Sequence, residues 1–221
     1  MSEELHQTIK DIKKQFRLSM NGVVSTHQRR QGLDYKINFG VEIPRLKEIA
    51  SGYAKDKALA EELWKDNIRE CKMLAIFLYP QEEFSEETAG RWLSECRFTE
   101  IADNLCHRLL IYMASPVSFA LCQINSEEAM RKYCGYSMLA HLFRGGSPVT
   151  SEEESRYLAA VKSALMDADL VSTVKNAASI SLMKYAGASD ERVSKVKEAL
   201  GDAAVEGNPT ISMLLENIGA F

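Results

Sequence analysis

The chain has 221 residues and a formal net charge of −4, and 46% of its residues are hydrophobic. This composition suffices for a packed core, and no apolar run approaches the roughly 20 residues that cross a bilayer, so we expect a protein with no membrane segment. Five cysteines at apolar positions without a CxxC pair, and a polar N-terminal segment without the apolar core of a signal peptide, predict reduced thiols, no metal site and a cytoplasmic location.

The charge is distributed unevenly along the chain. Residues 1–148 contain 20 Lys and Arg against 20 Asp and Glu, whereas residues 149–221 contain 7 against 11. This balance excludes a uniformly basic nucleic-acid-binding domain. A neutral total over residues 1–148 still permits a basic stripe on one face.

Hydrophobic residues recur at helical spacing along almost the whole chain. In chain order, helices are predicted over residues 2–20, 22–30, 43–53, 57–65, 67–79, 85–96, 99–114, 117–124, 127–144, 151–167, 170–186, 189–204 and 210–218. Thr150 with Glu153 has the spacing of a capping box at the start of one of them. No segment shows the sustained alternation of a half-buried strand. The predicted fold class is therefore all-α.

The predicted helices group into pairs of about 35–40 residues, which is the length of a HEAT-like repeat unit. We therefore predict an α-solenoid, in which helix pairs form an α-α superhelix with a concave groove. The pattern favours one array over residues 1–221, with N-terminal helices over residues 1–30 and C-terminal capping helices over residues 189–218.

Residues 39–78 contain the most informative pattern. The segment FGVEIPRLKEIA is followed, after a short gap, by ELWKDNIRECKMLAIFL. This block resembles the N-terminal signature of the AlkD family of DNA alkylation repair glycosylases. The resemblance depends jointly on Phe39, Gly40, Val41, Pro44, Ile49, Ala50, Leu63, Trp64, Glu70 and Ala75. It is clearest over residues 39–114 and stays collinear to about residue 185, so residues 39–185 are the predicted family core.

Thr99, Asp103 and His107 follow one another at four-residue spacing along one flank of a predicted buried stripe. In the resembled family this helix carries a Trp-x-x-x-Asp pattern, and Asp103 matches the Asp. The resemblance implies that the Asp103 carboxylate stabilises the positive charge that develops on the sugar as an alkylated purine departs. Positioning of a water is an alternative. A structural explanation is also open, because an Asp in an early helical turn complements the helix dipole.

Two positions depart from the pattern of the resembled family. The family's Trp falls on Thr99, which has no ring to stack on a sugar or base, and its groove Arg falls on Gly135, or on Cys134 in a second register. Arg131 lies one turn earlier on the same face and is a partial substitute. Gly135 is explained either by a close helix crossing or by close approach of a ligand. The predicted groove residues around Asp103 are Thr99, His107, Arg131 and Gly135.

Basic residues are spaced through successive predicted helix pairs. In a solenoid such residues can converge on one wall and bind phosphates, and an ordinary solvated surface is the alternative. The residues predicted to contact the DNA backbone are Arg69, Lys72, Arg108 and Lys132. Glu70, beside Arg69, is interpreted as fixing helix packing or forming an ion pair.

The functional prediction is a DNA-binding protein that resembles the AlkD-family glycosylases and has weakened or lost catalysis. The resemblance implies hydrolysis of the N-glycosidic bond of an N3- or N7-alkylated purine if the groove is active, with no metal or cofactor. It also implies duplex DNA, contacted through its backbone, as the partner. The competing prediction is a non-enzymatic HEAT-like scaffold that binds another protein. The missing Trp and Arg and the acidic total charge favour this alternative.

Overall fold

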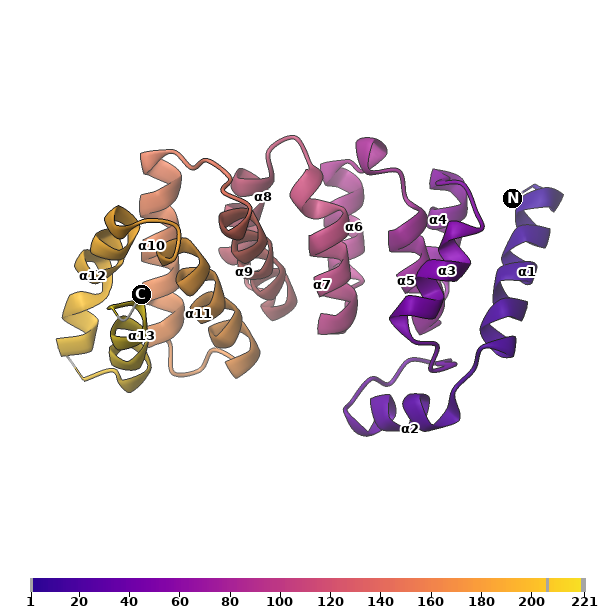
Figure 1. Cartoon of the computed structure of the whole chain (residues 1–221), viewed down its shortest axis with the longest axis horizontal. Coiled ribbons are helices and arrows are strands. Elements are labelled where there is room, and N and C mark those ends of the chain that lie inside the picture. Colours follow the sequence, from indigo (N-terminus) through magenta and orange to yellow (C-terminus); the bar gives the residue numbers. More distant parts are fainter. Residues whose placement is uncertain (1, 206, 220–221) are drawn as a thin grey trace. The chain divides into compact units, whose positions relative to one another are not determined.

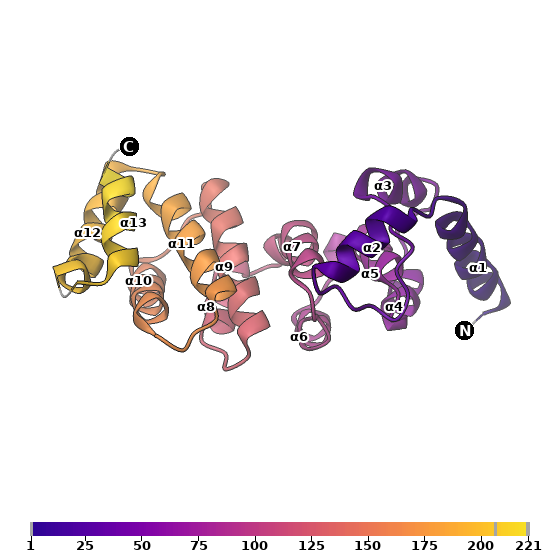
Figure 2. The ribbon, with the colours of Figure 1, turned by 90° about the horizontal axis from the view of Figure 1, so that it is seen from below.

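The structure is a computed structural model, and it describes residues 2–205 and 207–219. Over these residues the chain forms thirteen α-helices and two short 3-10 turns, and its only extended pairing is a single parallel bridge between Ile37 and Ile68. The predicted all-α fold class is confirmed. Contacts divide the chain into two compact units, residues 1–85 (unit 1) and residues 86–221 (unit 2) (Figures 1 and 2). The prediction of one array over residues 1–221 stays a prediction.

Unit 1 is built around two helices that pack against each other, α4 (Lys57–Lys65) and α5 (Arg69–Leu78). Two further helices, α1 (Glu3–Leu18) and α3 (Ile43–Ser51), pack on α4 and α5 respectively, and a 3-10 turn, η1 (Gln81–Glu83), follows α5. The apolar ridges of these helices form the core, in which Leu63, Trp64 and Leu74 are fully buried. The remaining helix, α2 (Gly22–Arg30), has no buried residue and runs crosswise to α1 (Figure 1).

A buried ion pair at the start of α5 holds the segment that follows α2. Arg69 is 1% exposed and Glu70 is fully buried. The Glu70 carboxylate accepts hydrogen bonds from the backbone N–H groups of Phe39 and Val41, both at 3.2 Å. Arg69 Nη1 donates to the Val41 carbonyl at 2.8 Å and to Glu70 Oε1 at 3.2 Å. The pair therefore satisfies backbone groups of residues 39–41 that no helix or sheet could satisfy.

Unit 2 begins with α6 (Glu86–Ser94), α7 (Thr99–Arg108), the 3-10 turn η2 (Leu110–Tyr112) and α8 (Pro116–Ile124). It continues with α9 (Ala129–Arg144), α10 (Ser151–Met166), α11 (Ser172–Ala186), α12 (Asp190–Val205) and α13 (Pro209–Gly219). Figure 1 shows these helices running back and forth as successive pairs. The central element is α9, because it packs against α7, α8 and α11.

Helices α8 and α9 approach each other closely at Gly135. A Cβ at this position would lie 2.6 Å from the Ile124 side chain and 2.8 Å from both the Ala120 carbonyl oxygen and the Ile124 backbone nitrogen. Two of these atoms belong to the α8 backbone and cannot rotate away. The close helix crossing, one of the two explanations offered by the sequence, therefore accounts for this glycine.

The helices begin and end near the predicted residues, with one exception. The capping box of α10 is present, since Thr150 Oγ1 accepts from Glu153 N and Glu153 Oε2 accepts from Thr150 N. The predicted helix over residues 99–114 instead ends at Arg108, because Leu109 leaves the helical conformation and η2 follows. Ser115 precedes a proline, which disfavours helical backbone at that residue. Among the described residues, no helix has both the length and the apolar character needed to span a membrane.

The C-terminal helices of unit 2 are joined through Glu154 in α10. Its carboxylate accepts hydrogen bonds from Tyr185 Oη of α11 at 2.5 Å and from Lys195 Nζ of α12 at 2.7 Å. Burial by itself would raise the pKa of Glu154, but the hydrogen bonds from Lys195 and Tyr185 outweigh it and lower this pKa. The ionised form of Glu154 thus contributes to the packing of three helices.

Candidate nucleic-acid interface

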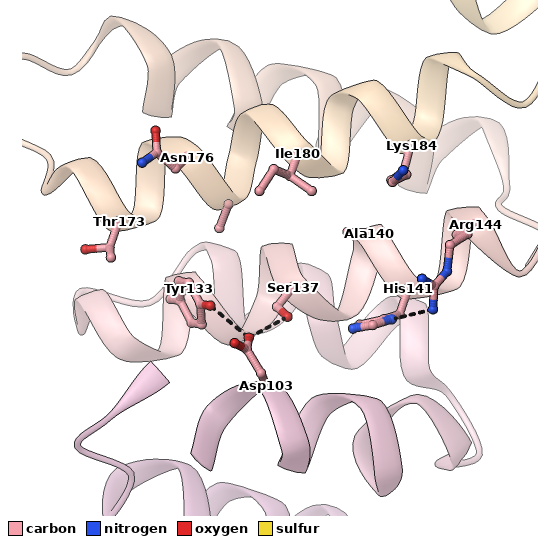
Figure 3. A pocket seen from close by; sticks show the side chains of 11 residues that line it. Asp103, Tyr133, Ser137, Ala140, His141, Arg144, Thr173, Asn176, Ile180 and Lys184 are labelled. Carbon is pink, nitrogen blue, oxygen red and sulfur yellow. Dashed lines mark hydrogen bonds between the residues drawn. The ribbon is translucent and has the colours of Figure 1, made fainter. Parts of the chain in front are cut away.

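A pocket of about 550 Å³ lies in unit 2 among three helices, α7, α9 and α11. Asp103 is the residue of α7 that reaches it, and the remaining lining comes from α9 and α11 (Figure 3). The residues that line the pocket are Asp103, Tyr133, Ser137, Ala140, His141, Arg144, Thr173, Asn176, Ala177, Ile180 and Lys184. The carboxylate of Asp103 and the cationic side chains of Arg144 and Lys184 therefore share this surface with several hydrogen-bonding groups.

Two hydroxyl groups of α9 hold the Asp103 carboxylate. Tyr133 Oη donates to Asp103 Oδ1 at 2.8 Å, and Ser137 Oγ donates to the same oxygen at 3.3 Å (Figure 3). Burial, followed by the hydrogen bond to Asp103 and its negative charge, raises the pKa of Tyr133 well above its usual range. Tyr133 therefore remains a proton donor to Asp103 at any physiological pH. Although exposed, the carboxylate is fixed in orientation and part of its acceptor capacity is used.

The His141 side chain of α9 lies beside the His107 ring and the Arg144 guanidinium. Its ring centroid lies 4.9 Å from that of His107, and Arg144 Nη2 lies 3.2 Å from His141 Nδ1. Because a guanidinium only donates, Nδ1 of His141 accepts this hydrogen bond and its proton resides on Nε2. Burial, the neighbouring His107 and the positive charge of Arg144 lower the pKa of His141. His141 is consequently neutral near pH 7, and the fixed positive charge on this side of the pocket comes from Arg144.

The opposite wall belongs to α11. Thr173, Asn176, Ile180 and Lys184 follow one another at intervals of three or four residues and are all exposed. Figure 3 shows Asn176, Ile180 and Lys184 spread along the length of α11 above the residues of α9. Arg144 and Lys184 lie toward one end of the pocket and Thr173 and Tyr133 toward the other.

The structure brings Asp103 to this surface but not the other predicted groove residues. Thr99 is the first residue of α7, is half-buried and does not line the pocket. His107 lies on the exposed flank beside His141 and also falls outside the lining. The prediction that Gly135 lines the groove is wrong, because the close approach of α8 buries this residue.

Arg131 also points away from the pocket. Its guanidinium donates to Glu128 Oε1 at 3.2 Å, to Gln123 Oε1 at 3.2 Å and to the Gly90 carbonyl at 3.1 Å. These partners lie at the start of α9, in α8 and in α6, so Arg131 ties three parts of unit 2 together. The prediction that Arg131 substitutes for the family's groove Arg is corrected on this ground.

The predicted phosphate-binding residues differ in exposure. Arg69 is buried in unit 1, where it holds Val41 and Glu70, so it cannot reach a phosphate and this prediction is wrong. The Lys72 ammonium lies 4.2 Å above the centroid of the Trp64 ring and is half-buried. Arg108 and Lys132 are also half-buried. A phosphate contact at Lys72, Arg108 or Lys132 stays a prediction.

Sequence reasoning did not find the polar stripe on α9. Tyr133, Ser137, His141 and Arg144 occupy positions i, i+4, i+8 and i+11, the same kind of spacing that drew attention to Asp103 on α7. The stripe was detectable as a polar flank of an otherwise apolar helix. The stripe faces Asp103 because of the way in which α7 and α9 pack. The helical period does not specify that packing.

Residues 12–121 match the model of the family described as DNA alkylation repair enzyme. Over these residues the chain is similar to DNA alkylation repair enzymes. The match runs from α1 into α8, and it includes Asp103 but not the pocket walls on α9 and α11.

A solved structure also resembles this chain, with a TM-score of 0.70, 19% sequence identity, and coverage of 93% of this chain and 82% of the other. It is described as belonging to a new family of proteins related to the HEAT-like repeat DNA glycosylases with affinity for branched DNA structures. At this identity the likeness shows the fold, which is the predicted HEAT-like helical repeat. A search of the curated proteins gave no match.

Proposed function

We propose that this protein, whose residues 12–121 match the DNA alkylation repair family, binds DNA through the pocket side of unit 2 and has weak or no glycosylase activity. The observation that carries the proposal is the pocket itself. It places an oriented carboxylate, Asp103, on a surface that also presents Arg144 and Lys184. A phosphate backbone is recognised by such exposed cations together with neutral hydrogen-bond donors, which Asn176 and Thr173 supply.

Weak catalysis follows from the surroundings of Asp103. A carboxylate that stabilises a sugar cation acts through its negative potential. The hydrogen bonds from Tyr133 and Ser137 disperse that potential over two hydroxyl groups. Neither of the two missing family residues is replaced at its own position, since Thr99 does not line the pocket and Gly135 is buried. We therefore expect Asp103 alone to give at most residual base excision.

Binding is tested by fluorescence anisotropy with a duplex and with a branched DNA of equal length, each at two salt concentrations. The branched DNA is included because the solved structure related in fold is described as having affinity for it. Replacing Arg144 and Lys184 by Ala is expected to lower affinity and to reduce the log–log salt slope by about 1.8, since each phosphate contact contributes roughly 0.9. The matched control replaces Arg156 and Lys197, one exposed Arg and one exposed Lys outside the pocket, and should leave both quantities unchanged.

Base excision is tested by release of 7-methylguanine and 3-methyladenine from methylated duplex DNA. Slow or absent release is expected, and Asp103→Asn should abolish whatever remains. Brisk release that survives Asp103→Asn would refute the assignment of Asp103. Absence of DNA binding by the unmodified protein would refute the proposal as a whole. It would favour the competing function, a scaffold for another protein, which the excess of acidic residues over residues 149–221 supports.

A further inference from the structure

The corner between α1 and α2 exposes three large apolar side chains. Leu18, the last residue of α1, is 78% exposed, Met20 is 65% exposed and Val23, in the first turn of α2, is 81% exposed. These three residues, the apolar corner, lie within six positions of the chain. Helix α2, which contains Val23, buries none of its nine residues. Clustered exposed apolar residues on a protein surface commonly mark a binding site.

The corner is held firmly although its side chains are exposed. The backbone N–H of Asn21 donates to the Phe39 carbonyl at 2.8 Å, and Asn38 Nδ2 donates to Gln28 Oε1 at 2.9 Å. Gly40, at a φ of 70°, lies so close to α2 that a Cβ there would collide with the Asn21 carbonyl and with backbone and side-chain atoms of Ser25. The segment 39–41 is in turn fixed by the buried Arg69–Glu70 pair described above. The matched signature residues therefore position α2.

The surroundings of the corner are basic, in a protein that is acidic overall. Residues 17–36 contain four Lys or Arg residues and one acidic residue, Asp34. The basic residues are Arg17, Arg29, Arg30 and Lys36. Arg45 of α3 also reaches the corner, where its Nε donates to Ser19 Oγ at 3.1 Å, but its charge is paired with Glu48 at 2.8 Å, so the basic character comes from the four residues of the chain segment itself.

Apolar and cationic side chains occur together on the exposed face of α2. A shallow hollow of about 340 Å³ is lined by Gly22, Val23, Thr26, His27 and Arg30. Val23, His27 and Arg30 follow the helical period, so an apolar and a cationic side chain share one face. An anionic partner that also offers an apolar surface fits this face. A DNA helix offers both where its stack is interrupted, since base faces are then exposed between phosphates.

We propose that the apolar corner inserts against unstacked bases at a branch in DNA while the basic residues of α2 hold the adjoining phosphates. Apolar wedges of this kind enter base steps in many DNA-bending proteins, at the cost of unstacking the step. At a branch the bases are already partly unstacked, so this cost is lower than in a continuous duplex. The inference rests on the proposed DNA-binding function and adds a second contact, in unit 1, that favours branched over duplex DNA.

The test compares the unmodified full chain with a triple variant, Leu18→Ser, Met20→Ser and Val23→Ser. All three side chains are exposed, so thermal unfolding should be unchanged, and this is measured first. The triple variant is expected to bind a three-way DNA junction about tenfold more weakly and a duplex of equal length with little change. A 2-aminopurine placed at the branch should brighten when the unmodified protein binds and should respond much less to the variant.

Met213→Ser and Val171→Ser are the matched controls, because both residues are exposed apolar side chains in unit 2; they should behave as the unmodified protein. If the unmodified protein binds neither DNA, the proposed function fails and this inference with it. If it binds the junction and the triple variant binds equally well, only the inference fails. An equal loss on junction and duplex also overturns branch-selective insertion. A change in sedimentation coefficient without a change in DNA binding overturns it in favour of a protein interface.

Discussion

Gly135→Ala tests whether the close crossing of α8 and α9 explains the glycine at a position where the sequence comparison predicted the family's groove Arg. In an unconstrained helix this substitution stabilises by up to about 1 kcal/mol, because alanine has the higher helix propensity. Here the new methyl group would lie 2.6 Å from the Ile124 side chain and 2.8 Å from two backbone atoms of α8. Overpacking of this kind costs about 1–3 kcal/mol. The cost of the crossing therefore offsets or exceeds the gain in helix propensity, and we expect a net destabilisation of up to about 2 kcal/mol.

The assay is thermal and urea unfolding followed by circular dichroism. A loss of about 1 kcal/mol corresponds to a decrease in Tm of roughly 2–4 °C for a protein of this size. Gly201→Ala is the matched control, since Gly201 lies inside α12 and a Cβ there meets nothing within 4 Å. This control should be stabilised by about 0.5–1 kcal/mol. If Gly135→Ala is as stable as Gly201→Ala, the packing explanation is refuted. Close approach by a ligand would then be the favoured explanation for the glycine at position 135.

The contacts around position 135 also decide where a cation can be introduced near Asp103. An arginine at position 135 would need far more space than a methyl group, and the atoms it meets first belong to the α8 backbone. Gly135→Arg is therefore expected to disrupt unit 2 and cannot restore a groove arginine. A cation is better introduced at Ser137, whose side chain faces Asp103.

Three further predictions concern buried or titrating groups. Glu70→Gln should destabilise the protein by about 3–5 kcal/mol in urea unfolding, because it removes one charge of a buried ion pair; a loss below 1 kcal/mol would contradict a stabilising role for the Arg69–Glu70 pair. Glu154 has a lowered pKa, so its contribution to stability should be complete above its usual value of 4.5 and should be lost as the pH falls through the lowered pKa. Glu154→Gln should flatten this part of the plot of stability against pH, and an unchanged plot would contradict the stabilising role of ionised Glu154. His141 also has a lowered pKa, so the unfolded chain binds its proton more tightly and acidification below pH 6.5 should destabilise the fold. An NMR titration should place the His141 midpoint below 6.5, Arg144→Ala should raise it, and a midpoint above 6.5 would refute the stated environment.

Much of the secondary structure was determined by the sequence alone. Helical periodicity and capping chemistry are local, since they depend on residues three or four positions apart, and Thr150 with Glu153 forms the predicted capping box for that reason. The break after Arg108 escaped this reasoning, because the apolar pattern continues through η2 and only the backbone at Leu109 departs from the helix. Periodicity also placed Asp103 and His107 on one flank of α7, and both are exposed there.

Which flanks face one another was decided only by the tertiary structure. Arg69 appears in the sequence as an ordinary basic residue near a helix start, yet the return of residues 39–41 onto α5 buries it and gives it a structural role. Asp103 receives its hydrogen bonds from Tyr133 and Ser137, about 30 residues away in the chain. A helical period specifies the direction of a side chain about its own helix axis. The neighbour it meets depends on how helices distant in sequence pack, and here that packing made Asp103 part of a polar pocket and Gly135 part of a helix crossing.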